Sequence, residues 1–146
     1  MRITSGTLKN KKIKSREGNE TRPTLERIKE AIFSIIGDKV VESKFLDLYS
    51  GTGNMAIEAL SRGAKRAILI EKNQEALRII IENINDCKLE NKSRAYKNES
   101  LRAIEILNRK NEIFDIIFMD PPYKENLTEN TIKHVSFCSF LCFNRI

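Results

Sequence analysis

Short apolar segments alternate with amphipathic ones along most of this chain of 146 residues, and this alternation constrains the fold more than any other feature. Strand-like and helix-like segments that follow one another at this spacing are typical of a parallel sheet with helices on both faces. We therefore predict an α/β fold with a doubly wound, mostly parallel sheet. The expected strands cover residues 44–50, 66–71, 94–98 and 114–120; the expected helices cover 23–36, the end of 51–63, 73–85, and a segment that begins at residue 100.

Two of these segments carry more detailed expectations. In the first helix, Pro23 suits the first turn, and Gly37 ends the helix. An apolar stripe for packing is expected on that helix at Leu25, Ile28, Ile32 and Ile35. The fourth strand, 114–120, contains an unbroken apolar run at residues 116–119 before its final acid, which predicts burial on both faces.

The net charge of +6 is concentrated at the N-terminus. Residues 1–30 contain nine basic and four acidic side chains, a net charge of +5, whereas the rest of the chain carries +1. A basic segment on a near-neutral body favours a polyanionic partner, although a solvated tail has the same composition. We expect residues 1–22 to form a basic arm or small hairpin and residues 23–146 to form the main domain.

The remaining composition narrows the class of protein. The three cysteines, Cys87, Cys138 and Cys142, form no CxxC pair and are interpreted as reduced thiols of a cytoplasmic protein. With one histidine in the chain, we expect no metal site. No apolar run has the length of a membrane span, and the N-terminus lacks the apolar segment of a signal peptide, so we expect no membrane partner.

A glycine loop follows the first expected strand. Residues 51–56 (GTGNMA) formally match the dinucleotide pattern GxGxxG/A, which is weak evidence alone. Asp47, however, lies four residues before Gly51, at a position that is usually apolar in dinucleotide-binding strands. An acid beside a glycine loop suits a cationic ligand without phosphate, and S-adenosylmethionine is such a ligand. Asp47 would bind its amino group, and Gly51 and Gly53 would let the backbone approach it.

Two further acids follow expected strands. Glu71 lies 18 residues beyond Gly53, where an acid can accept both hydroxyls of a ribose. This role is common to nicotinamide and methionine-adenosine binders, so it does not separate them. Glu99 follows the third strand and could accept a hydrogen bond from an adenine amino group; a surface acid is the alternative for both residues.

The segment DPPY, residues 120–123, ends the fourth strand in an unusual way. The exocyclic amine of a nucleobase is a poor nucleophile, because its lone pair is delocalised into the ring. Two acceptors aimed at its N–H bonds, the Asp120 carboxylate and the Pro121 carbonyl, would stabilise the positive charge that develops during methyl transfer. Tyr123 would stack on the base, and Asp120 could then take the proton. The alternative is a proline-rich turn after a buried strand.

With these motifs, the chain resembles the class I S-adenosylmethionine-dependent methyltransferases, whose sheet is Rossmann-like, and within them the bacterial RsmD-type enzymes. Those enzymes methylate the exocyclic N2 of one guanine in small-subunit ribosomal RNA. The resemblance rests on MRITSGTLKNKKI, TRPTLERIKEAIFSII, FLDLYSGTGNMAIEALSRGA, the glutamate of LIEKN, and FDIIFMDPPY. It extends from Met1 to about His134.

The resemblance implies a role for each matching residue. The cofactor S-adenosylmethionine would be bound by Asp47, Ser50, Gly51, Thr52, Gly53, Glu71 and Glu99. The catalytic tetrapeptide would be Asp120, Pro121, Pro122 and Tyr123. Ribosomal RNA, within a small-subunit particle, would be contacted by Arg2, Lys9, Lys11, Lys12, Arg22, Thr24 and Arg27. Full-length relatives are expected to be monomeric.

One departure from the family affects these expectations. RsmD-type enzymes continue after DPPY through a helix and three further strands, whereas this chain ends 23 residues past Tyr123, with the unfamiliar segment FCSFLCFNRI. A sheet without its last strands would leave the fourth strand at an edge with an apolar flank. We therefore expect reduced stability, or dimerisation or aggregation through that edge. A monodisperse monomer with a cooperative melt at high temperature would argue against this.

Other functions remain open from the residues alone. An adenine-N6 DNA methyltransferase would share the DPPY chemistry, and only the segment RPT…KEA.F and the basic arm favour RNA. A catalytically inactive nucleic-acid-binding remnant would keep the arm without the activity. A nicotinamide-dependent dehydrogenase fits least well, because it would leave Asp47 and Asp120 without a role.

Overall fold

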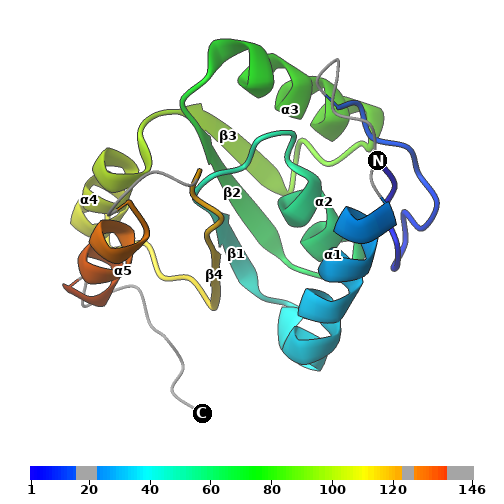
Figure 1. Ribbon diagram of the computed structural model, residues 1–146, viewed down its shortest axis with the longest axis horizontal. Helices are drawn as coiled ribbons and strands as arrows, with labels where there is room; N and C mark the ends of the chain where they lie inside the picture. Colours follow the sequence, from blue (N-terminus) through cyan, green and yellow to red (C-terminus); the bar gives the residue numbers. More distant parts are fainter. Residues whose placement is uncertain (16–22, 123–126, 138–146) are drawn as a thin grey trace.

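The computed structural model describes residues 1–15, 23–122 and 127–137. The elements follow in the order α1 (Pro23–Ile36), η1 (Gly37–Val40), β1 (Lys44–Asp47), α2 (Asn54–Ser61), β2 (Arg66–Glu71), α3 (Gln74–Asp86), β3 (Ser93–Lys97), α4 (Ser100–Arg109), β4 (Ile116–Phe118) and α5 (Leu127–Phe137). All strand pairs are parallel, in the spatial order β3-β2-β1-β4. The predicted α/β fold with a doubly wound parallel sheet is therefore confirmed (Figure 1).

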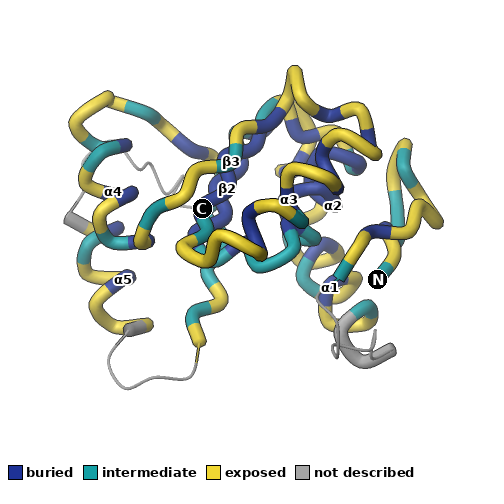
Figure 2. The backbone as a smooth tube through the Cα atoms, turned by 90° about the horizontal axis from the view of Figure 1, so that it is seen from above, coloured by how far each residue is buried: buried dark blue, intermediate teal, exposed yellow. Residues whose placement is uncertain are grey.

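Two apolar cores lie on opposite faces of the sheet, because neighbouring residues of a strand point to opposite sides. On β1, Phe45 belongs to the core beneath α1, α2 and α3, while Leu46 belongs to the core beneath α4 and α5. The helices therefore form a layer on each face, and buried positions concentrate between the layers (Figures 1 and 2).

The packing of α1 differs from the sequence prediction. We expected the stripe that contains Ile28, Ile32 and Ile35 to face the core. Instead Phe33 is buried and stacks on Phe45, whereas Ile35 is 86% exposed and Ile28 is 51% exposed. Leu25, the fourth residue of the stripe, lies among the side chains outside the described set. The prediction was wrong because hydrophobic spacing identifies a possible apolar face, not the face that meets the sheet.

The fourth strand also differs from expectation. Burial on both faces was predicted for residues 114–120, but β4 covers only Ile116–Phe118, and its side chains are half-buried. Within the described residues, β4 pairs with β1 alone and forms one edge of the sheet. An edge strand has one covered side fewer than an internal strand, which explains the lower burial.

The N-terminal segment, residues 1–15, packs against the domain. Arg2 and Lys12 form an antiparallel bridge, and Ile3 and Ile13 are buried in the core shared with α2 and α3. Gly6, with φ +82°, approaches the end of α2 so closely that an added Cβ would lie 1.8 Å from the carbonyl oxygen of Ser61. In these residues a docked hairpin, rather than a solvated tail, carries the positive charge.

Two composition-based expectations can be compared with the described residues. Cys87 is buried and not bonded to another cysteine, while Cys138 and Cys142 lie outside the described part of the chain. In the described part, no helix combines the length and the apolar character that crossing a bilayer requires.

Candidate cofactor and active site

The predicted acids meet at the carboxyl ends of three neighbouring strands. Asp47 ends β1 and Glu71 ends β2, while Asp120 follows β4 by two residues. In register, Asp47 is paired with Leu69 of β2 and with Phe118 of β4, and the Leu48 N–H donates to the Phe118 carbonyl at 3.0 Å. The sheet continues from β1 to β2 on one side, whereas β4 lies on the other side of β1, so the strand order reverses at β1 (Figure 1). Open α/β sheets bind ligands at the carboxyl ends of the strands at such a switch point.

Asp47 is almost completely buried, with 1% of its surface exposed. Its Oδ1 accepts a hydrogen bond from the Tyr49 N–H at 3.3 Å, while Oδ2 has no partner among the described residues. The pKa of this carboxyl is raised from 3.8 to about 7, mainly by desolvation and to a smaller extent by the negative charges of Glu71 and Asp120. A buried oxygen without a partner is costly, so this site suits a cationic group that would pair with it.

The glycine loop is held by hydrogen bonds from several elements. The Ser50 N–H donates to the Ile70 carbonyl at 3.0 Å, and the Gly53 N–H donates to the Ser50 carbonyl at 2.7 Å. Gly51 and Gly53 have φ values of +56° and +78°, which favour glycine. An added Cβ at Gly53 would also lie 3.1 Å from Leu69 Cδ2. The loop therefore combines left-handed turns with close packing against β2.

Glu71 supports this loop. Its Oε2 accepts from the Gly51 N–H at 2.9 Å, and its Oε1 accepts from the Asn73 N–H at 2.8 Å. Each carboxylate oxygen can accept more than one hydrogen bond, so both could still bind ribose hydroxyls. That Glu71 contacts the cofactor stays a prediction. The structure shows in addition that Glu71 holds the glycine loop, which the sequence did not predict.

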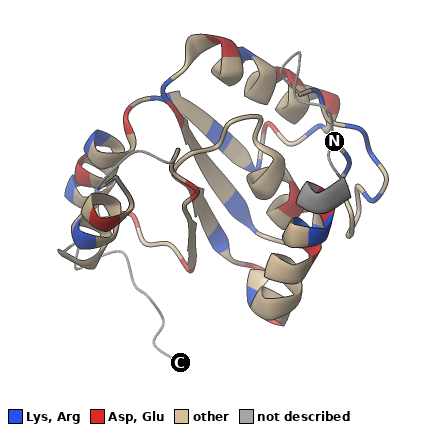
Figure 3. Ribbon diagram, in the orientation of Figure 1, with Lys and Arg blue, Asp and Glu red and all other residues tan. Residues whose placement is uncertain are grey.

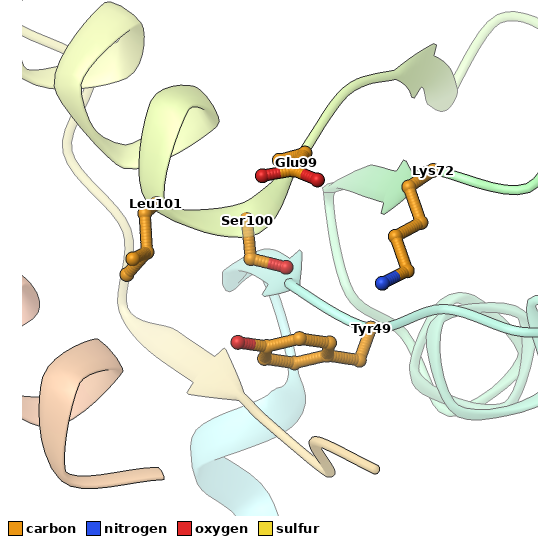
Figure 4. A pocket seen from close by; sticks show the side chains of 5 residues that line it. All are labelled: Tyr49, Lys72, Glu99, Ser100 and Leu101. Atoms are coloured by element: carbon orange, nitrogen blue, oxygen red, sulfur yellow. The ribbon is translucent and has the colours of Figure 1, made fainter. Parts of the chain in front are cut away.

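Glu99, the acid predicted to contact the adenine, lines a pocket beside the loop. Glu99 is exposed at the start of α4 and lines this pocket with Tyr49, Lys72, Ser100 and Leu101 (Figure 4). Sequence reasoning missed Tyr49 and Lys72. Tyr49 could have been noticed as the residue between Asp47 and the glycines; its hydroxyl lies 2.8 Å from Thr131 Oγ1 and so links the loop to α5.

The predicted catalytic tetrapeptide is described in part. Asp120 and Pro122 are exposed and Pro121 is half-buried, whereas Tyr123 lies outside the described residues. The exposure of Asp120 contrasts with the burial of Asp47 at the neighbouring strand end. Asp120 is therefore accessible to a large substrate, while Asp47 is enclosed by the fold.

The predicted RNA contacts have different surroundings. Arg2, Lys9, Lys11, Lys12 and Arg27 are exposed, and Figure 3 shows the basic residues of the N-terminal segment beside α1 and α3. Arg22 lies outside the described residues, and so does the side chain of Thr24. The described basic side chains are thus available to a polyanion.

A buried ion-pair network connects the N-terminal segment to α1 and α2. Glu58 is fully buried, and its carboxylate lies 2.9 Å from Lys29 Nζ and 2.8 Å from Arg62 Nε. It also accepts hydrogen bonds from the backbone N–H groups of Thr4 and Ser5. Burial alone would raise the pKa of Glu58, but these donors and cations together hold it below the ordinary value. Sequence reasoning missed this network: Arg62 is only four residues from Glu58, but Lys29 and the N-terminal segment are remote from it in sequence.

The arrangement of fold and site is that of the class I methyltransferases: a Rossmann-like parallel sheet, a glycine loop after the first strand and acids at the strand ends. The chain belongs to the family described as conserved hypothetical protein 95, whose family model matches residues 1–142. That family is RsmD-like, as the sequence resemblance indicated.

Individual relatives agree with this assignment. The chain is 37% identical over 125 residues to YlbH of Bacillus subtilis, covering 86% of this chain and 68% of the relative. It is 32% identical over 133 residues to the ribosomal RNA small subunit methyltransferase D of Escherichia coli, covering 91% and 65%. The chain thus spans about two thirds of the length of these relatives.

Solved structures are similar as well. The structure of the protein yhhF from Escherichia coli matches with a TM-score of 0.85 and 28% identity, covering 97% of this chain and 75% of that chain. A Thermus protein matches with a TM-score of 0.80 and 26% identity, covering 94% and 79%. These matches support the fold over nearly the whole chain.

Proposed function

We propose that this protein transfers a methyl group from S-adenosylmethionine to the exocyclic N2 amine of a guanine in small-subunit ribosomal RNA. One observation carries the proposal: a buried carboxylate with an oxygen that has no described partner, Asp47 Oδ2, lies at the start of a glycine loop and beside Asp120. The Escherichia coli relative named for small-subunit ribosomal RNA supports the choice of substrate.

The residues present fit the cofactor. Asp47 would pair with its amino group, since the buried Oδ2 has no hydrogen-bond partner among the described residues and can accept from a cation. Ser50, Gly51, Thr52 and Gly53 would surround it with backbone that carries no large side chain. At the two adjoining strand ends, Glu71 would accept from ribose hydroxyls and Glu99 from the adenine amine. When bound, S-adenosylmethionine would supply the activated methyl group.

The residues of DPPY would act on the acceptor. The Asp120 carboxylate and the Pro121 carbonyl would each accept a hydrogen bond from one N–H group of the guanine amine and so orient its lone pair. Pro121 and Pro122 would keep this turn rigid, and Tyr123 would stack on the extruded base. As the nitrogen becomes positively charged, Asp120 would take one proton, leaving a neutral secondary amine.

The RNA would lie against the basic N-terminal side of the molecule. Arg2, Lys9, Lys11, Lys12 and Arg27 are exposed there, and Arg22 and Thr24 precede or begin α1. Contacts of these side chains with phosphates would be independent of sequence, so they would position the RNA rather than select the guanine. A folded small-subunit particle in the cytoplasm is the expected substrate.

The experiment is a calorimetric titration of the chain with S-adenosylmethionine, with Asp47→Ala as its partner variant. Saturable binding that Asp47→Ala loses supports the cofactor site. Radiolabelled methyl transfer to small-subunit particles then follows, with Asp120→Asn as the catalytic variant, and product nucleosides are separated to identify N2-methylguanosine. Label in N6-methyladenine of DNA would favour the rival function, and binding without transfer to either substrate would contradict the enzyme proposal.

A further inference from the structure

Asn83 is a buried polar residue that none of the roles above includes. It lies on α3, with 1% of its surface exposed, and its amide makes three hydrogen bonds. Its Oδ1 accepts from the Lys14 N–H at 2.8 Å, and its Nδ2 donates to the Lys14 and Thr52 carbonyls, both at 3.0 Å. Both N–H groups of the amide are thus used, so the side chain has one preferred orientation.

One of these bonds fixes the centre of the glycine loop. Thr52 stands between Gly51 and Gly53, which both have positive φ values. Because glycine has no side chain, the peptide groups beside it can rotate more freely unless something holds them. Glu71 accepts a hydrogen bond from the Gly51 N–H, and Asn83 donates one to the Thr52 carbonyl. The shape that the loop presents to a cofactor therefore depends on Asn83.

The other two bonds fix the end of the N-terminal segment. They pair with both backbone groups of Lys14, as a neighbouring strand would. The Lys14 ammonium adds ion pairs to Glu82 and Asp86, each at 3.2 Å, but these are exposed and so contribute little. A single buried amide thus joins the segment that carries Lys9, Lys11 and Lys12 to the glycine loop.

We propose that Asn83 is a positioning residue for the cofactor site and that, through it, cofactor binding and docking of the N-terminal segment strengthen each other. The proposal rests on the proposed function, because it needs S-adenosylmethionine as the ligand. Coupling of this kind is reciprocal: if the docked segment stabilises the binding conformation of the loop, the bound cofactor must stabilise the docked segment by the same factor. The basic side chains of the segment would then be presented to RNA most firmly when the cofactor is bound.

The first test compares cofactor affinity among variants by calorimetry. Asn83→Leu removes all three hydrogen bonds at similar volume, and Asn83→Asp replaces the donor facing Thr52 by an acceptor. Lys14→Met is the matched control, because it removes the exposed ion pairs and keeps the backbone bonds. We expect about fivefold or greater loss of affinity for folded Asn83 variants and less than about twofold for Lys14→Met.

The second test needs no variant. Hydrogen exchange of the Lys14 amide, which donates to Asn83, is measured in the wild-type chain with and without saturating S-adenosylmethionine. Slower exchange with the cofactor is expected, because the bound cofactor would stabilise the docked segment. A purely structural role of Asn83 would leave this exchange rate unchanged. Unchanged exchange, or Asn83 variants that bind as tightly as the wild type, would overturn the inference alone. A wild-type chain that binds no cofactor would overturn the proposed function, and this inference with it.

Discussion

Replacing Asp47 by asparagine should stabilise the free protein at neutral pH and abolish cofactor binding. The carboxyl has a folded-state pKa of about 7, against an ordinary value of 3.8. Between these values the folded chain holds a proton that the unfolded chain has released, so stability falls as pH rises from about 4 to about 7. A difference of roughly three in pKa corresponds to about 4 kcal/mol, which is an upper figure for this loss.

The assay is urea unfolding of wild type and Asp47→Asn at intervals from pH 5 to pH 8. Any cost of burying the new amide is independent of pH, so the change with pH in the difference between the two stabilities isolates the carboxyl. This difference should grow in favour of Asp47→Asn as pH rises, by up to about 3 kcal/mol over the range, because the effect levels off above pH 7. Asp38→Asn, at an exposed position, is the matched control, and the change with pH is compared between the two variants.

Parallel stability curves for wild type and Asp47→Asn would refute the reasoning, because the carboxyl would then titrate alike in both states. A cofactor that pairs with ionised Asp47 adds a second observation. Its affinity for the wild type should decline by about tenfold for each pH unit below 7. The stability gained by Asp47→Asn and the affinity lost would have the same origin, a buried charge that only a ligand neutralises.

Three further changes test the packing around the site. Gly6→Ala should displace the N-terminal segment, because its Cβ would lie 1.8 Å from the last carbonyl oxygen of α2, and hydrogen exchange near the N-terminus should become faster. Gly37→Ala is the control: it also has a positive φ but no close atoms, so exchange near the N-terminus should stay unchanged. Lys29→Met should cost about 3 to 5 kcal/mol in urea unfolding, because it leaves the buried Glu58 without one of its cations, and a cost near zero would contradict the network. Asn73→Ala should cost about 1 kcal/mol through loss of the N-cap of α3, and Asn73→Asp should restore most of it, as measured by the same unfolding assay.

The secondary structure could be predicted well because it depends on neighbouring residues. The second strand was predicted at residues 66–71 and is found at Arg66–Glu71, and the helix start at Asn73 is a cap whose side chain accepts two backbone N–H bonds. The order of strands and helices was sufficient to predict the parallel sheet. It could then be predicted that Asp47, Glu71 and Asp120 lie on the same side of the sheet, because the carboxyl ends of parallel strands all lie there.

Local patterns could not predict which polar groups are buried or what they contact. Burial of Lys29 was not predicted, because its partners Glu58 and Asn54 are distant in sequence. Asn83 gave no sequence clue, since asparagine in a helix is usually exposed, and its partners at Lys14 and Thr52 are 69 and 31 residues away.

The sequence by itself therefore determined the fold class, the glycine loop and the acids that follow the strands. These depend on short-range periodicity and on residue types that turns require. Tertiary structure alone decided that the basic N-terminal residues pack against the domain and that Ile35 rather than Phe33 is exposed. It also decided that one buried oxygen of Asp47 has no partner among the described residues. The physical reason is that desolvation and hydrogen bonding of a group depend on everything packed around it, and most of those neighbours come from remote parts of the chain.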